Sequence, residues 1–380
     1  MPALRTDIDP DGLLEYSVVF TDRSLNHMSE AFQAVMHDIH RTLCDTYRAD
    51  RAVIVPGGGS YAMEAVARQF ATDASTLVIR NGLFSYRWSQ IFAKGAIPRT
   101  ESVLCAERVG TGDQAPFAPC PIDRAVAQIA ADRPDVVFAP HVETASGILL
   151  PDDYIRTLAD AVHRHGGLLV LDCVASGCAW IDMEALGVDV LISAPQKGWS
   201  APPSAGLVMM RAEALERCRA RQSTSFAVDL GRWLEITEAY LGGGFAYHAT
   251  MPTDALRTLR DAMAEAESIG LDRLQEAQWE LGRSVRRLLA ERGFPSVAAA
   301  RFEAPGVVVS YTSDPEIQNG RKFVSAGFQV AAGVPLMVAE GADFRTFRIG
   351  LFGLDKLTDI AGTRDRLATA LARLGEPTTA

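Results

Sequence analysis

The chain has 380 residues, of which 48 % are apolar and 22 % charged, a composition typical of a globular protein of enzyme size and not of a disordered or fibrous one. Its net charge of −10 argues against nucleic acid or an anionic membrane as the main partner, because both would favour an excess of Lys and Arg, and it leaves small molecules as the expected partners. The start has no signal-peptide pattern, no apolar run reaches the ~18 residues of a membrane span, and the six cysteines include no C-x-x-C pair, so we expect a cytoplasmic protein.

Short apolar runs alternate with longer segments of helical spacing over the first 250 residues. The predicted strands are 51–56, 75–80, 134–140, 167–172, 189–194 and 205–210. The predicted helices between them include 61–71, 84–94, 122–131 and 153–165. Strands that alternate with helices in this way predict a mostly parallel sheet that is covered on both faces.

The pattern changes beyond residue 250. A long helical stretch covers 253–293, short strand candidates follow at 306–312 and 346–353, and a closing helix is predicted near 358–374. This order indicates a smaller α+β lobe after the large α/β domain, with a boundary near 250–255.

The first strand is followed by "GGGSYAMEAVARQF", a glycine run that opens directly into a helix. Glycine lets backbone N–H groups approach a ligand closely, and a helix N-terminus favours an anion such as phosphate. The same letters fit the dinucleotide pattern G-x-G-x-x-A at Gly57, Gly59 and Ala62, and Arg80 at the end of the next strand leaves that alternative open. A tight turn without a ligand explains the glycines equally well.

Two charged residues each end a buried strand. Asp172 ends "GLLVLD", at the edge where open α/β sheets bind ligands, and it either caps a helix or pairs with the protonated ring nitrogen of pyridoxal phosphate. Lys197 follows 25 residues later in "SAPQKGW". It is either an exposed loop lysine or a buried amine whose lowered pKa suits a Schiff base.

The order of glycine turn, aspartate and lysine is joined by further motifs: "NGLFSYRW", "HVETASGI", "LDCVAS", "SAPQKGWSAPP", "YHATMP" and "FRIGLFG". Together they resemble the class V aminotransferases of the pyridoxal-phosphate fold type I superfamily, in the alanine/serine–glyoxylate and aspartate–glyoxylate branch, over residues 27–375. The resemblance implies an α/β fold with a mostly parallel seven-stranded sheet between helices and a smaller C-terminal α+β domain. It divides the chain into an N-terminal segment bordering the active site (1–30), a large cofactor-binding domain (31–252) and a small domain (253–380).

The resemblance also implies roles for individual residues. Lys197 would hold pyridoxal 5'-phosphate as a Schiff base and move the substrate proton, Asp172 would pair with the pyridinium nitrogen, and Arg348 would grip the substrate α-carboxylate through its planar fork. Arg345 is expected on the surface. The remaining cofactor contacts are Gly58, Gly59 and Ser60 at the phosphate, Phe84 and Val174 on the two ring faces, Thr144 near the phenolic oxygen, Gln196 on the phosphate side, and Tyr247 and Thr250 reaching the site of the neighbouring subunit of a homodimer.

The predicted function is a ping-pong transamination from a small amino acid of the alanine, serine or aspartate type to a 2-oxo acid such as glyoxylate or pyruvate. This assignment displaces the dinucleotide alternative. A β-eliminating C–S lyase and a non-catalytic cofactor-binding protein remain as alternatives, whereas a desulfurase lacks its C-terminal cysteine, because none follows Cys218. No metal is predicted, since His141 and His248 have no ligand cluster at suitable spacing.

The chain departs from the family pattern at two places. The usual Gly-Pro pair near the start is missing, and Arg23 and Asn26 there either contact a polar substrate or belong to a helix capped at Ser24 or Asn26. Gly58 stands where many relatives carry a hydroxyl residue, so that a phosphate hydrogen bond is lost or moved to Ser60 or Tyr61.

Overall fold

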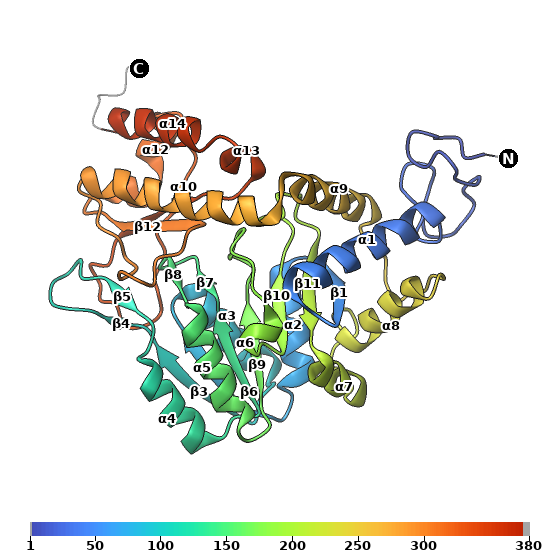
Figure 1. Ribbon diagram of the computed structural model, residues 1–380, viewed down its shortest axis with the longest axis horizontal. Coiled ribbons are helices and arrows are strands. Elements are labelled where there is room, and N and C mark those ends of the chain that lie inside the picture. The colour runs from blue at the N-terminus through green and yellow to red at the C-terminus, as the bar shows by residue number, and fades with distance from the viewer. Residues whose placement is uncertain (1, 375–380) are drawn as a thin grey trace.

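A computed structural model describes residues 2–374 of the chain. Its centre is a seven-stranded sheet (Figure 1). In spatial order the strands are β1 (Arg51–Pro56), β11 (Ala205–Met210), β10 (Val190–Ser193), β9 (Leu168–Asp172), β6 (Val136–Pro140), β2 (Ser75–Arg80) and β3 (Thr100–Cys105). β10, β9, β6, β2 and β3 pair in parallel, and β11 runs antiparallel to both of its neighbours. The predicted mostly parallel seven-stranded sheet is therefore confirmed.

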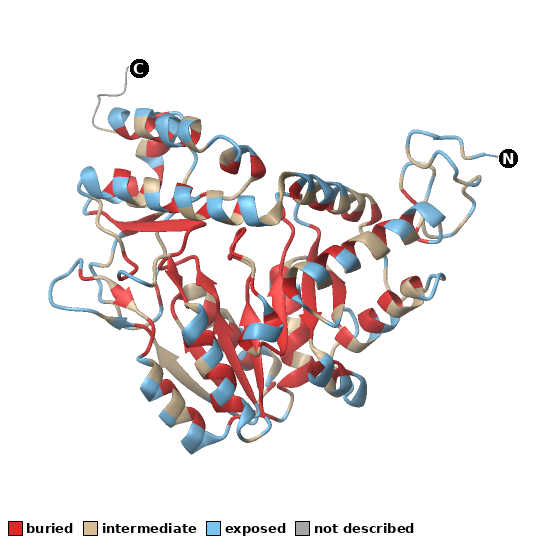
Figure 2. Ribbon diagram, in the orientation of Figure 1, coloured by how far each residue is buried: buried red, intermediate tan, exposed pale blue. Residues whose placement is uncertain are grey.

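Helices cover both faces of this sheet. They are α1 (Glu30–Tyr47), α2 (Gly59–Phe70), α3 (Leu83–Gly95), α4 (Ile122–Asp132), α5 (Asp152–His163), α6 (Met183–Leu186), α7 (Ala212–Ala220) and α8 (Leu230–Leu241). α4, α5 and α6 lie in front of the sheet in Figure 1, and α2 and α3 lie behind it. Every residue of β6, β9, β10 and β11 is buried as a result (Figure 2), which explains their continuous apolar runs.

β3 has no counterpart among the six strands predicted from sequence. Its sequence "TESVLC" carries polar residues, and its burial is only partial because it forms the edge of the sheet. Such a strand lacks the apolar run that identifies the buried strands.

The second part of the chain begins with α9 (Thr253–Ile269) and α10 (Leu271–Glu291). The single long stretch of the prediction is thus two helices, separated at Gly270 with a φ of 103°. A three-stranded antiparallel sheet follows, with β12 (Val307–Tyr311), β14 (Thr346–Gly350) and β13 (Ala331–Ala332) in that order. The accompanying short helices are α11 (Pro315–Gln318), α12 (Arg321–Ser325) and α13 (Leu354–Leu357), and α14 (Ile360–Arg373) closes the chain.

Two larger apolar cores underlie this division. Leu256, Leu259 and Met263 of α9 pack into the core of the large sheet. Leu274 and Leu281 of α10 pack into the second core, with β12, β14 and α14. The short pairs β4 (Glu107–Arg108) with β5 (Phe117–Ala118) and β7 (Val142–Glu143) with β8 (Ile148–Leu149) complete the strands.

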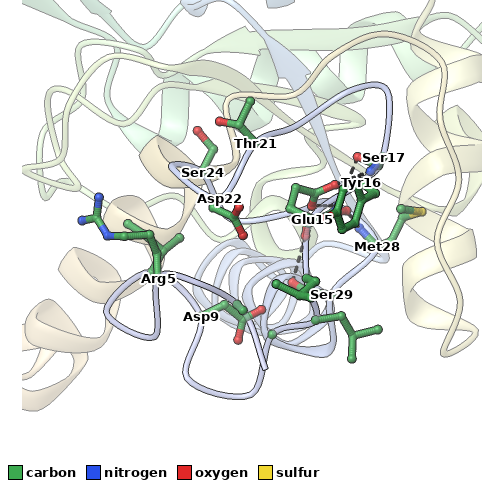
Figure 3. Close-up of a pocket in the computed structure, with 16 residues that line it drawn as sticks. Arg5, Asp9, Glu15, Tyr16, Ser17, Thr21, Asp22, Ser24, Met28 and Ser29 are labelled. Carbon is green, nitrogen blue, oxygen red and sulfur yellow. Dashed lines mark hydrogen bonds between the residues drawn. The ribbon is translucent and has the colours of Figure 1, made fainter. Parts of the chain in front are cut away.

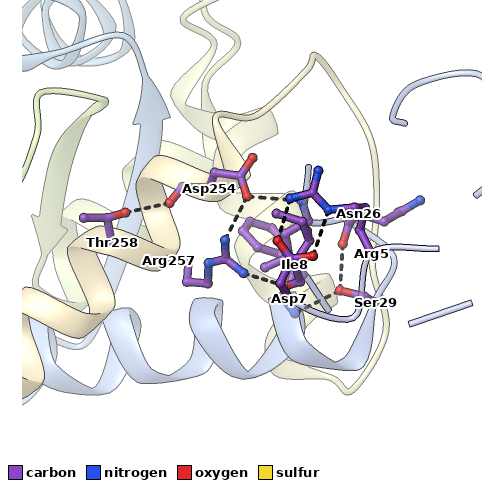
Figure 4. Close-up of polar contacts among 10 residues, drawn as sticks. Arg5, Asp7, Ile8, Asn26, Ser29, Asp254, Arg257 and Thr258 are labelled. Carbon is purple, nitrogen blue, oxygen red and sulfur yellow. Dashed lines mark hydrogen bonds and ion pairs between the residues drawn. The ribbon is translucent and has the colours of Figure 1, made fainter. Parts of the chain in front are cut away.

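The segment before α1 lies at one end of the molecule, beside α1 (Figure 1). It is tied to the start of α9, because Asp254 Oδ1 accepts from the backbone N–H of Leu25 at 3.2 Å and Arg257 Nη1 donates to the carbonyl of Ile8 at 2.6 Å (Figure 4). α1 begins after Ser29, whose Oγ accepts from Phe32 N at 3.1 Å. The helix cap is therefore Ser29, and the caps considered at Ser24 and Asn26 were wrong. Within residues 2–374, no helix has the length and apolarity to cross a membrane.

Candidate active site

A cavity of about 190 Å³ lies at the carboxyl ends of the parallel strands. This cavity, the sheet-edge cavity below, is lined by Gly59, Ser60, Met63, Phe84, Arg87, Val142, Thr144, Asp172, Val174, Ala175, Gln196 and Lys197. Eight of the predicted site residues are thus brought together from five separate segments: Gly59, Ser60, Phe84, Thr144, Asp172, Val174, Gln196 and Lys197. Gly58 directly precedes this lining, whereas Arg348, Tyr247 and Thr250 lie outside it.

The glycine turn joins β1 to α2. Gly57 has a φ of 123°, and a Cβ there would come within 2.5 Å of the Tyr61 ring, so only glycine fits. Its N–H donates to the carbonyl of Ser204 at 2.9 Å, which fixes the turn against the start of β11. Gly58 is the N-cap of α2 without a side-chain cap, and a Cβ at Gly58 would meet nothing within 4 Å. No side chain caps the N-terminus of α2 and the space at the Gly58 Cβ position is open, as an anion site requires.

Asp172 is the last residue of β9 and is buried. Its Oδ1 accepts from Val174 N at 3.0 Å. Because the next helix, α6, begins only at Met183, the aspartate caps no helix. Burial raises the pKa of Asp172 to about 6, and the nearby Glu143 adds to this effect. A buried carboxyl group of this kind gains stability from a cationic hydrogen-bond donor placed in the cavity.

Lys197 lies in the turn after β10 and is only partly exposed. Burial lowers the pKa of its amine, and the positive charges of Arg348 and Arg87 lower it further, against the opposing effect of Asp172. The backbone at Gly198 passes so close to Gly177 that a Cβ would lie 2.3 Å from the Gly177 carbonyl oxygen. The lysine is therefore held by a tightly packed turn, and the exposed-loop alternative does not hold.

Phe84 stands beside two guanidinium groups. The Arg87 Cζ lies 5.1 Å and the Arg348 Cζ 5.6 Å from its ring centroid. Arg348 donates from Nε to the carbonyl of Ala332 at 2.9 Å, and burial lowers its pKa. Arg345 is exposed, as expected. Arg348 thus lies next to a residue of the cavity lining, with its charge felt at Lys197.

Glu143 is a residue of this region that sequence reasoning missed. Its buried carboxylate accepts from Phe84 N at 3.2 Å, Ser85 N at 2.8 Å, Ser85 Oγ at 2.7 Å and Ala145 N at 2.9 Å. Burial raises its pKa. The carboxylate fixes the first turn of α3, which carries Phe84 and Arg87. The available signal was an acidic residue inside the motif "HVETASGI", because the sequence around it gave no exposed face of a strand or helix to which it could belong.

Tyr247 and Thr250 lie together, with their hydroxyl oxygens 3.1 Å apart, and Tyr247 is 53 % exposed. The Tyr247 ring centroid is 5.6 Å from that of His27, which also contacts Phe20 and Phe245. This loop therefore packs on the N-terminal segment and does not reach the sheet-edge cavity of its own chain.

A second cavity, of about 330 Å³, lies within the N-terminal segment (Figure 3). It is lined by residues from Ala3 to Ser29. Asn26, one of its lining residues, donates to Glu15 and Ser17 and accepts from Met28 N, so that its amide is used within the segment. Since the sheet-edge cavity is lined by residues 59–197, a role of residues 1–30 at an active site stays a prediction.

Comparisons with known proteins agree with this geometry. The family model for aminotransferase class-V matches residues 14–314. The chain is 27 % identical over 365 residues to a 2-aminoethylphosphonate–pyruvate transaminase of Burkholderia ambifaria (strain MC40-6), covering 93 % of each chain. It is 28 % identical over 361 residues to an alanine–glyoxylate aminotransferase of Oryctolagus cuniculus, covering 91 % of this chain and 86 % of that protein. The crystal structure of an alanine–glyoxylate aminotransferase from Nostoc sp. has the same fold, with a TM-score of 0.77, 21 % identity, and coverage of 92 % and 89 %.

Proposed function

The chain belongs to the class V aminotransferases, and from this premise we propose that it moves the amino group of a small amino acid, of the alanine, serine or aspartate type, to a 2-oxo acid such as glyoxylate or pyruvate. The enzyme is a transaminase that depends on pyridoxal 5'-phosphate. The observation that carries the proposal is the sheet-edge cavity, which places an amine of lowered pKa, a buried carboxyl group and an uncapped helix N-terminus around one space.

The residues present fit the cofactor. The N-terminus of α2, with Gly58, Gly59 and Ser60, would hold the phosphate, and Gln196 lies in the same lining. Phe84 and Val174 would contact the ring faces, and Thr144 would lie near the phenolic oxygen. When bound, pyridoxal phosphate supplies an electron sink that stabilises negative charge at the substrate Cα.

Asp172 and Lys197 have opposite tasks in this arrangement. The buried Asp172 carboxylate would hold a proton on the ring nitrogen of the cofactor, because an ion pair there removes the cost of its burial. Lys197, whose lowered pKa increases the fraction of neutral amine near neutral pH, would bond to the cofactor aldehyde in the absence of substrate. Once the substrate amine has displaced it, the freed lysine amine would take the proton from the substrate Cα. The tight packing of the turn at Gly198 against Gly177 holds the backbone of this lysine in place.

We propose that Arg348 binds the substrate α-carboxylate. Its Nε is already engaged by the carbonyl of Ala332, which orients the guanidinium and leaves its Nη groups for a carboxylate. Holding the carboxylate would orient the substrate so that its Cα gives up a proton and not carbon dioxide.

We also propose a homodimer in which Tyr247 and Thr250 reach the phosphate of the partner's site. Support comes from their position outside the cavity of their own chain and from exposed apolar side chains on the adjoining N-terminal segment, where Tyr16 is 89 % and Val18 102 % exposed. A second copy of the chain would cover such a surface. The six unpaired cysteines support a reducing, cytoplasmic location.

The test is an absorbance titration of the purified protein against a panel of amino acids. We expect the band of lysine-bound cofactor to be lost in Lys197→Ala and kept in Lys94→Ala, which changes an exposed lysine on α3. Amino acid alone should convert the wild-type cofactor to its amine form, and a 2-oxo acid should restore the band. Release of pyruvate with ammonia or sulfide from amino acid alone would instead establish the β-eliminating lyase, which the family match does not favour.

A further inference from the structure

Arg87 lines the sheet-edge cavity, and no role was predicted for it. It lies on α3, and its Nη1 donates to Ser60 Oγ at 2.9 Å. Ser60 is the second residue of α2 and lies next to the helix N-terminus that no side chain caps. The guanidinium of Arg87 is therefore held at the phosphate end of the cavity.

The charge of the lining makes this position significant. A cofactor phosphate brings up to two negative charges, whereas the lining contains only Arg87 and Lys197 as cations. Lys197 is committed to the aldehyde end, and the α2 N-terminus offers only partial positive charge, typically about half an elementary charge. Gly58 adds no side chain to this end, although a Cβ there would meet nothing within 4 Å.

We propose that Arg87 is a phosphate-binding residue of the cofactor site, which supplies the full positive charge that the turn at Gly58, Gly59 and Ser60 lacks. This inference rests on the proposed function, because it presumes that pyridoxal phosphate binds in the sheet-edge cavity. In the bound state Arg87 donates to phosphate oxygens from the fork that now contacts Ser60, and the Ser60 hydroxyl is free to donate to the same group.

Phe84 helps to fix the position of the Arg87 guanidinium group. The Arg87 Cζ lies 5.1 Å from the Phe84 ring centroid, a distance at which the cation is attracted to the ring. Glu143 in turn fixes the first turn of α3 through its bonds to Phe84 and Ser85. Arg348 contacts the same ring but donates to Ala332, so the two arginines are bonded to different segments. Arg87 is thereby assigned to the phosphate and Arg348 to the substrate carboxylate.

The experiment compares two ligands that differ only in the phosphate. Dissociation constants of pyridoxal phosphate and of pyridoxal are measured by the absorbance of the lysine-bound form, in cofactor-free wild type, Arg87→Met and Arg87→Lys. Lys94→Met is the control, because it removes one positive charge from an exposed site on the same helix. Inhibition of cofactor uptake by inorganic phosphate is measured in the same proteins.

In Arg87→Met we expect pyridoxal phosphate to bind about 10- to 100-fold more weakly, the range for losing a hydrogen bond to a charged group, while pyridoxal binding changes little. Inorganic phosphate should compete less well by a similar factor. Arg87→Lys should fall between wild type and Arg87→Met, because it keeps the charge and loses the planar fork, and Lys94→Met should match wild type.

Equal weakening of both ligands in Arg87→Met and in Arg87→Lys would overturn the proposal, since it would show that Arg87 only supports Phe84. Unchanged cofactor binding combined with a raised KM for acidic amino donors would also overturn it and would assign Arg87 to the substrate side chain. If Arg87→Met does not fold, the dissociation constants of pyridoxal phosphate and pyridoxal in Arg87→Lys test the proposal: weaker binding of pyridoxal phosphate alone supports it, and equal weakening of both overturns it. Lys197-dependent uptake of pyridoxal phosphate by the wild type would leave the proposed function intact in each of these cases.

Discussion

The Asp172 carboxyl group is buried, with its pKa raised to about 6. Against an ordinary pKa of about 3.9, this shift corresponds to roughly 3 kcal/mol. The folded state therefore binds this proton more tightly than the unfolded state does. The resulting stabilisation is complete below about pH 4 and is lost as the pH rises through about 6, above which a buried anion must be maintained.

Asp172→Asn removes that anion, so we expect the cofactor-free variant to gain stability relative to wild type as the pH rises. Urea unfolding at pH 5 and at pH 8 measures this, and the difference between variant and wild type should grow by roughly 1–3 kcal/mol. Asp113→Asn, at an exposed position in the loop between β4 and β5, is the control and should show no such trend. A difference that is constant with pH would contradict the burial argument.

Arg348 yields a prediction for catalysis. Arg348→Lys keeps the charge but cannot bind a carboxylate through two parallel bonds, so we expect kcat/KM for the amino acid to fall by about 10- to 100-fold. Arg345→Lys, three residues earlier and exposed, should retain wild-type values. An Arg348→Lys variant with unchanged kcat/KM would remove this arginine from the substrate site.

The site residues that sequence alone identified share a property: each differs in polarity or size from the residues around it. Lys197 and Asp172 are charged residues at the ends of apolar strands, and Gly57 to Gly59 form a glycine run where a strand passes into a helix. Arg87 gave no such contrast, because an arginine on an amphipathic helix is usual. Its place three residues after Phe84, on the same helix face, was the available signal. Glu143 was hidden for a related reason, since its partners are three backbone N–H groups and the Ser85 hydroxyl, which no sequence pattern reveals.

At the scale of elements, the turn that carries Lys197 depends on its close contact with Gly177. Gly198→Ala would place a Cβ 2.3 Å from the Gly177 carbonyl oxygen, so the lysine turn must shift. We expect a loss of about 1–3 kcal/mol in the free energy of unfolding and weaker formation of the lysine-bound cofactor band.

The matched control for this prediction is Gly242→Ala. Gly242 ends α8 with a φ of −78°, and its nearest contact for a new Cβ is 3.4 Å, so alanine fits there. Denaturant unfolding and the absorbance band are measured together in both variants. A Gly198→Ala protein with the stability and band of wild type would show that the turn has more room than its geometry indicates.

The elements predicted from sequence were those with a strong period. The buried strands and the helices α2 to α5 followed from apolar runs and helical spacing, and the order of strands and helices was enough for a parallel sheet. β3 was not predicted because this edge strand has no continuous apolar run. The break at Gly270 was not predicted because α9 and α10 continue the same helical period. The domain boundary at residue 253 stays a prediction, although α9 packs with the large core.

For the whole molecule, a shared site predicts complementation between defective subunits. Lys197→Ala should be inactive, and Tyr247→Ala should bind cofactor poorly at limiting concentration. If the site is shared as proposed, the site of a mixed dimer that keeps Lys197 would receive Tyr247 from the other subunit and would be intact. Dissociation and statistical re-association of equal amounts should therefore restore about a quarter of wild-type activity, because half of the dimers carry one intact site of two.

The control is a mixture of the same proteins kept below the concentration at which subunits exchange, which should show only the sum of the parents. Sedimentation velocity on the same samples establishes the oligomer. A mixed population whose activity equals the mean of its parents after exchange would exclude the contribution of Tyr247 across the interface.

The pairing of β1 with β11 has a consequence for how the chain folds during synthesis. Arg51 pairs with Met210 and Pro56 with Ala205, and β11 is the only neighbour of β1 in the sheet. β1 leaves the ribosome roughly 10–30 s before β11 does, at typical rates of synthesis, and its hydrogen-bonding edge has no partner strand in that interval. The glycine turn reaches its contact with Ser204 only after that delay. Cofactor capture is therefore confined to the late stages of translation or to the completed chain, and the nascent β1 edge is the segment that a chaperone would protect.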